Sequence, residues 1–129
     1  MSLDRASTIT RWIAALRSGA YAQTRQVLRD GHGHCALGVL ADLLAQDGLG
    51  RWGASHDRPG AYDFVDTAGC TIPGCLPEDL GQQLGLSIEA QNAISRMNDA
   101  GWDFAQIADR IEAAWDGKRL RASILTRLY

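Results

Sequence analysis

The sequence predicts a predominantly helical α+β fold, with five or six helices packed around a short two- or three-stranded β element. Apolar residues recur at helical spacing before residue 46 and again after residue 76. Between these regions, residues 47–75 hold six glycines, two prolines and one strand-like alternation. A chain of 129 residues fits one domain. We therefore expect a globular domain over residues 1–117, followed by a basic amphipathic tail over residues 118–129.

A helix is predicted over residues 7–18, because one apolar stripe recurs there at i, i+3, i+4 and i+7: Ile9, Trp12, Ile13 and Leu16. Either Asp4 or Ser7 can cap its start, and Gly19 marks its end.

The stretch DGHGHC at residues 30–35 is predicted to be a turn that leads into a second helix. That helix, residues 36–45, is apolar on most of its surface and has Asp42 as its only charge, which is typical of a central, buried helix. Gly38 within it is expected to permit close packing of a neighbouring element.

Residues 61–67, AYDFVDT, are predicted to form a strand, paired with a short strand near Val27 and surrounded by loops. A connection as long as residues 47–75 favours a functional surface.

The last third is predicted to be helical. Pro77 stands in the first turn of a helix that ends at Gly85, and Ser87 caps the next helix. Asp103 and Gln106 have the spacing of a capping box at the start of a further helix. The tail carries four basic residues and no acidic ones, and it is either a sixth helix or an arm that docks on a second copy of the chain.

Composition excludes several classes of protein. The formal net charge is -2, so no overall positive field attracts nucleic acid or anionic lipid. No apolar run reaches the length of a membrane span, and the first ten residues do not read as a secretion signal. We expect a soluble cytoplasmic protein with no cofactor and no membrane partner.

A metal site is one alternative, because His32, Cys35, Cys70 and Cys75 are ligand types that zinc accepts. Their spacing does not fit a zinc knuckle, since four residues including Pro73 separate the last two cysteines. The sequence therefore predicts no metal site, with this set as the alternative.

A thiol enzyme is a second alternative. Cys35 immediately precedes a helix, where the helix dipole can lower the pKa of a thiol. His34 or His56 would have to serve as its base. The apolar residues that follow predict instead that Cys35 is buried, so no catalytic residue is assigned.

Nucleic-acid binding is disfavoured. Residues 87–115 resemble a helix-turn-helix only superficially, because the second helix exposes Asp109, Glu112 and Asp116 against a single Arg110.

Three aromatic residues, Trp52, Tyr62 and Phe64, are the predicted binding residues. They lie in the glycine-rich segment from Leu49 to Cys75, and aromatic side chains on such a segment suit a recognition surface.

Four ordered stretches, ALRSGAYAQ, HCALGVLADL, LPEDLGQQLGL and MNDAGWDFAQIADRIE, are collinear with the motifs LRSGxYxQ, YCxLGVLxD, LP…LGL and LNDxGxSFxxIADxIE. Over residues 12–115 the chain thus resembles a family of small uncharacterised proteins carried mainly by phages and prophages. In full, the second motif of the family reads roughly YCCLGVLCD, and this chain has His34, Ala36 and Ala41 in place of its tyrosine and two of its cysteines. The loss of these cysteines weakens the zinc alternative further. The resemblance implies a phage setting and no activity.

We therefore expect a non-enzymatic accessory protein of a phage or mobile element that binds a host or phage protein and interferes with a defence or regulatory complex. A cysteine-dependent hydrolase or transferase that uses Cys35 and a small zinc-stabilised binding domain are the alternatives.

Overall fold

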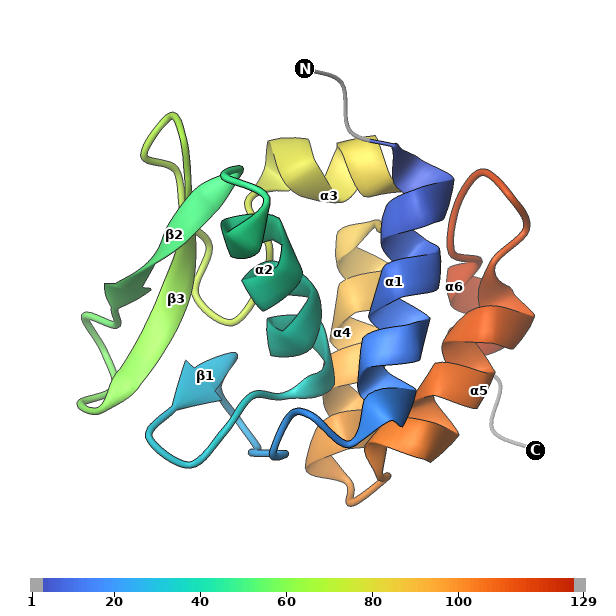
Figure 1. Cartoon of the computed structure of the whole chain (residues 1–129), viewed down its shortest axis with the longest axis horizontal. Coiled ribbons are helices and arrows are strands. Elements are labelled where there is room, and N and C mark those ends of the chain that lie inside the picture. The colour runs from blue at the N-terminus through green and yellow to red at the C-terminus, as the bar shows by residue number, and fades with distance from the viewer. Residues whose placement is uncertain (1–3, 127–129) are drawn as a thin grey trace.

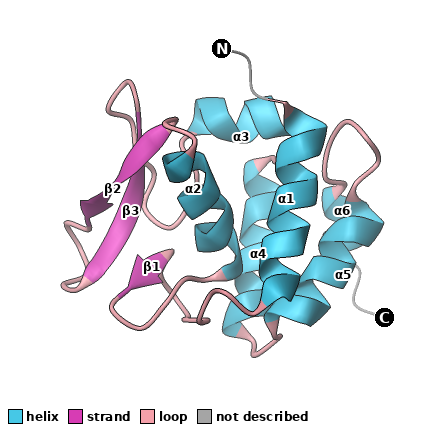
Figure 2. Ribbon diagram, viewed as in Figure 1, coloured by secondary structure: helices cyan, strands magenta, loops and turns pink. Residues whose placement is uncertain are grey.

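Helix α2 (Ala36–Gln46) lies at the centre of the computed structural model, between a three-stranded sheet on one side and helices α1 and α4 on the other (Figure 1). The structure describes residues 4–126. The remaining helices close the top and the far side of the helical layer (Figure 2). In chain order, the helices other than α2 are α1 (Arg5–Ser18), α3 (Glu78–Leu84), α4 (Ile88–Asp99), α5 (Phe104–Ala114) and α6 (Ala122–Leu125). The predicted class, α+β and predominantly helical, is confirmed.

The sheet has the order β1-β3-β2, and both of its strand pairs are antiparallel. The central strand β3 (Ala61–Asp66) is the predicted one, and β1 (Arg29–Asp30) is its predicted short neighbour. Strand β2 (Gly50–Ala54) corrects the prediction, because these residues were expected to be loop. Its sequence, GRWGA, contains two glycines, which disfavour strands.

The helix starts follow the predicted capping chemistry. Of the two candidates for α1, Asp4 is the cap, and its carboxylate accepts a hydrogen bond from the Ser7 amide. Asp103 and Gln106 form the predicted capping box at α5. Each satisfied amide removes one unpaired donor from a helix terminus, so the sequence sets where these helices begin.

Helix α2 is buried from Ala36 to Ala41, and its close approach to the preceding loop depends on Gly38. A Cβ atom added at Gly38 would lie 1.9 Å from the carbonyl oxygen of Leu28. The amide of Cys35 donates to that same carbonyl, at 3.0 Å. The backbone before β1 is therefore pressed directly onto the first turn of α2, as predicted from the glycine.

The basic tail contributes to the core. Helix α6 forms within it, and Leu120 and Leu125 are 3% and 2% exposed. The apolar side of residues 118–126 thus covers the chain's own helices α4 and α5. Residues 127–129 of the tail lie outside the described part of the chain.

None of the helices between residues 4 and 126 has both the length and the apolar character that crossing a bilayer requires.

The substitution Gly38→Ala is expected to lower the free energy of unfolding by more than about 2 kcal/mol, because backbone would have to move to admit the methyl group. Gly31→Ala is the matched control, since a Cβ atom there meets nothing within 4 Å. Urea unfolding of both variants measures the difference. Equal stabilities of the two variants would contradict the packing described here.

Candidate functional site

The three predicted binding residues lie on one face of the sheet. Trp52 and Phe64 are register partners on β2 and β3, and Tyr62 stands two residues before Phe64, so their side chains share a face. Their exposure differs: Phe64 is fully buried, Trp52 is half-buried and Tyr62 is 37% exposed. Phe64 is therefore part of the core on this face, and of the three side chains only Trp52 and Tyr62 are accessible to a partner.

Arg29 completes this face, although no motif or spacing in the sequence indicated it. It is the register partner of Tyr62 on β1. Its guanidinium carbon lies 5.3 Å from the ring centroid of Tyr62 and 5.4 Å from that of Trp52. Both distances are within cation–π range. Arg29 thus connects the half-buried Trp52 ring and the exposed Tyr62 ring into one surface, which we call the aromatic face (Arg29, Trp52 and Tyr62).

A row of rings continues from this face into the protein. Trp52 meets Phe64 edge-on at 6.1 Å between centroids and His34 at 5.8 Å, and His34 meets Tyr21 at 5.1 Å. The His34 side chain is only 16% exposed. Its Nε2 atom is buried without a hydrogen-bond partner and lies 3.9 Å from Oδ1 of Asp42.

Asp42, the one charge on α2, holds this row in place through three hydrogen bonds. Its carboxylate accepts from the Tyr21 hydroxyl at 2.7 Å, from Nε1 of Trp52 at 3.0 Å and from Nε2 of Gln46 at 3.0 Å. Burial alone would raise the pKa of Asp42, but these donors stabilise the carboxylate and the net effect lowers its pKa. For the Tyr21 hydroxyl, which donates to Asp42, burial and this hydrogen bond raise the pKa to about 12.

His34 is neutral at pH 7. Burial lowers its pKa from the ordinary value of 6.5, and this effect exceeds the opposing attraction of Asp42; the positive charge of Arg29 lowers it further. The contact between His34 and Asp42 is therefore not an ion pair at neutral pH. A charged imidazole at this position would lack part of the hydration that it has in water and would be repelled by the positive charge of Arg29.

Cys35, the candidate nucleophile, is the N-cap of α2 and is 4% exposed. Its Sγ accepts a hydrogen bond from the Gly38 amide at 3.3 Å. Burial nevertheless raises the pKa of the thiol to about 11, so it is protonated at pH 7. Of the two candidate bases for Cys35, His34 makes edge-on contacts with Tyr21 and Trp52, and His56 lies on an exposed loop. Burial of the thiol is the opposite of what a reactive cysteine requires.

The alternative metal ligands do not assemble. Across residues 4–126, no group of three or more His, Cys, Asp and Glu side chains is placed to hold a metal ion. His32 and Cys70 are exposed, whereas Cys35 is buried at the start of α2. His32, Cys35, Cys70 and Cys75 therefore do not form a common site in this structure.

Asn98 and Asp99, at the end of α4, hold the loop that carries His34. The fully buried Asn98 accepts hydrogen bonds from the Ala36 amide at 3.0 Å and from Nε2 of Gln23 at 2.9 Å. Its own amide donates to the carbonyl of Thr24 at 2.8 Å. Asp99 accepts from the amide of Gln26, a non-glycine residue with φ of 70°. These side chains are structural and satisfy backbone groups.

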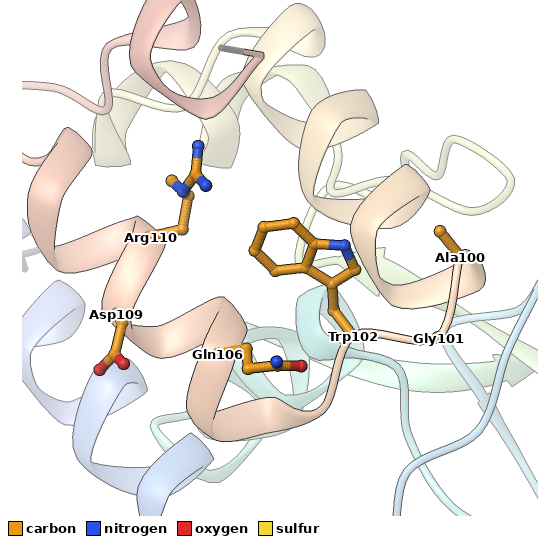
Figure 3. A pocket seen from close by; sticks show the side chains of 6 residues that line it. All are labelled: Ala100, Gly101, Trp102, Gln106, Asp109 and Arg110. Atoms are coloured by element: carbon orange, nitrogen blue, oxygen red, sulfur yellow. The ribbon is translucent and has the colours of Figure 1, made fainter. Parts of the chain in front are cut away.

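A hollow of about 630 Å³ lies beside the turn that connects α4 to α5 (Figure 3). Arg110 stacks over Trp102 at 5.2 Å in its wall, and Asp109 points away from Trp102 and bonds Arg17 at 2.7 Å. A neighbouring hollow shares Ala100 and Trp102 and reaches Thr126, the last described residue. The sequence did not indicate these depressions, and their lining shows no constellation that would carry a reaction.

Comparison with known protein families gives one match. Residues 6–115 match the family described as Domain of unknown function (DUF8296). The chain belongs to this family. No curated protein and no solved structure matches it.

The pKa of His34 sets a pH dependence for this DUF8296 protein. Because the folded state lowers that pKa, the unfolded chain binds the proton more readily. The His34 contribution to stability is therefore complete above the unfolded value of 6.5 and is lost as the pH falls below it. In urea unfolding between pH 8 and pH 5, His34→Tyr is expected to flatten this loss. The exposed His56→Gln variant, as control, should retain it. An unchanged pH profile for His34→Tyr would contradict the assignment.

Burial of Cys35 predicts selective alkylation. In the native protein at pH 8, iodoacetamide should modify the exposed Cys70 and leave Cys35 unmodified until the chain is unfolded in urea. Peptide mass mapping measures both sites in one sample, so Cys70 serves as the internal control. Rapid modification of Cys35 in the folded protein would instead favour the thiol-enzyme alternative.

Proposed function

We propose that this protein acts without catalysis, by binding another protein through the aromatic face. One observation carries the proposal: Tyr62 is 37% exposed and stands against Arg29, which also stacks on Trp52. Among the described residues, Tyr62 and Ile88 are the two large apolar side chains classed as exposed. Tyr62 alone of the two belongs to a cluster of interacting side chains.

The chemistry of the face supports this role. Tryptophan, tyrosine and arginine are the residues that most often dominate the energetics of protein interfaces. The Trp52 ring is fixed by its bond to Asp42 and by its edge-on contact with Phe64, so little side-chain entropy remains to be lost on binding. A partner would therefore meet a surface that is already ordered.

The biological setting rests on the resemblance to phage and prophage proteins. In that setting the partner is a host or phage protein in the cytoplasm, and binding interferes with a defence or regulatory complex. The thiol-enzyme alternative is weaker, because the Cys35 thiol is buried and has a raised pKa. The zinc alternative would require its four ligands to move together.

Photo-crosslinking tests the proposal. With p-benzoylphenylalanine in place of Tyr62, the protein should crosslink to one defined protein in cells that carry the gene, and mass spectrometry identifies it. Purified partner is then titrated with Tyr62→Ala and Arg29→Ala, each expected to weaken binding about tenfold or more.

Ile88→Ala is the matched control, because Ile88 is 44% exposed and lies on α4, away from the sheet. It should bind the partner as tightly as the unchanged protein. Equal losses for Ile88→Ala and Tyr62→Ala, or no loss for either, would refute binding through the aromatic face.

A further inference from the structure

Strand β2 has an open edge, and the hydrogen-bond pattern shows which groups it presents. Antiparallel pairs alternate between hydrogen-bonded and non-bonded partners. The Ser55 amide donates to the carbonyl of Ala61, which continues the β2–β3 register and makes this a bonded pair. By alternation, Arg51 and Gly53 direct their backbone groups toward β3, whereas Gly50, Trp52 and Ala54 direct theirs away from it.

A second observation agrees with this alternation. Asp66, the partner of Gly50, turns its amide away from β2 and donates to the carbonyl of Cys70. On the opposite side of β2, no other residue between 4 and 126 hydrogen-bonds to the outward amides and carbonyls of Gly50, Trp52 and Ala54. The edge thus carries alternating donors and acceptors in the pattern that an added strand requires.

Arg51 decides which strand fits this edge. Arg51 is exposed, and its Nη1 lies 3.4 Å from the position that a Cβ atom on Gly53 would occupy. Its guanidinium therefore lies along β2, next to Gly53. No carboxylate among the described residues forms an ion pair with it. Two copies paired antiparallel about Trp52 would place each Arg51 opposite Gly53 of the other copy, so the two arginines would be diagonal neighbours on the same face, an arrangement that like charges oppose. An acidic strand would neutralise Arg51.

We infer that the partner adds an extended, acidic segment to the free edge of β2, with a carboxylate next to Arg51. This inference rests on the proposed function and names the partner's chemistry. Side chains of the added strand opposite Trp52 would lie on the same face as its ring. The strand would thereby connect the edge to the aromatic face.

Hydrogen exchange of the unchanged protein provides the first test, with a decapeptide of alternating glutamate and valine as the probe. In the free protein, the amides of Gly50, Trp52 and Ala54 should exchange faster than those of Arg51 and Gly53, which bond β3. Saturating peptide should slow the three outward amides about tenfold or more. A lysine–valine decapeptide should leave them unchanged. Absence of protection by the acidic peptide, or equal protection by both, would overturn the inference.

Two variants locate the interaction. Ala54→Pro removes an outward N–H that β3 does not use and should abolish peptide binding, whereas Ala54→Val keeps that N–H and should bind. Arg51→Glu should weaken binding of the acidic peptide about tenfold and admit the basic one. Thermal melting confirms that the variants are folded. If Ala54→Pro does not fold, Arg51→Glu and the exchange data decide the outcome.

The possible results separate this inference from the proposed function. Loss of partner binding in Tyr62→Ala, with no peptide protection at β2, would overturn strand addition and leave the aromatic face as the binding site. Dimerisation of the free protein that protects the β2 amides, measured by sedimentation, would identify a second copy as the occupant and also overturn it.

Discussion

The buried amide of Asn98 is the interaction on which the rest of the structure depends. It joins the end of α4 to the first amide of α2 and to the backbone of Thr24. The segments that contain these groups are not joined to one another by a common helix or sheet. Without Asn98, the Ala36 amide and the Thr24 carbonyl would lack these hydrogen bonds inside the protein. By fixing the start of α2 and the loop before it, Asn98 also helps to position His34, which contacts the Trp52 ring.

The protonation states of Asp42 and His34, behind the aromatic face, depend on a balance between desolvation and hydrogen bonding. Asp42 sits on an otherwise apolar helix, and three donors keep it ionised there. His34 receives no comparable compensation, because its Nε2 has no partner and Arg29 is nearby. Asp42 therefore stays charged and His34 stays neutral. The Tyr21 and Trp52 rings, which contact both residues, are held at fixed orientations. If the aromatic face binds a partner as proposed, this rigidity reduces the side-chain entropy that is lost on binding.

The sequence predicted well wherever one local interaction decides the structure. The capping box of Asp103 and Gln106 could be predicted because it depends only on residues that are close in sequence. The role of Gly38 could be predicted because glycine, which has no side chain, is the residue that permits such close packing. Strand β2 was missed because Gly50 is there to admit the Phe64 ring, a contact that forms only in the folded chain. Arg29 was missed for the same reason, since its aromatic neighbours lie far along the sequence. Tertiary contacts, which periodicity does not encode, account for both.

Because Asn98 anchors the loop that carries His34, next to the aromatic face, it affects when this face can form during synthesis of the chain. Tyr21, His34, Trp52 and Tyr62 are all translated well before Asn98, yet the loop that positions His34 is anchored only when α4 is present. Contacts of such long sequence separation slow folding, because the entropy of the intervening chain must be lost before they can form. A nascent chain that already contains every residue of the aromatic face therefore cannot present it in its final form. Under the proposed function, a partner would therefore bind the chain only after α4 has been synthesised and has packed against this loop.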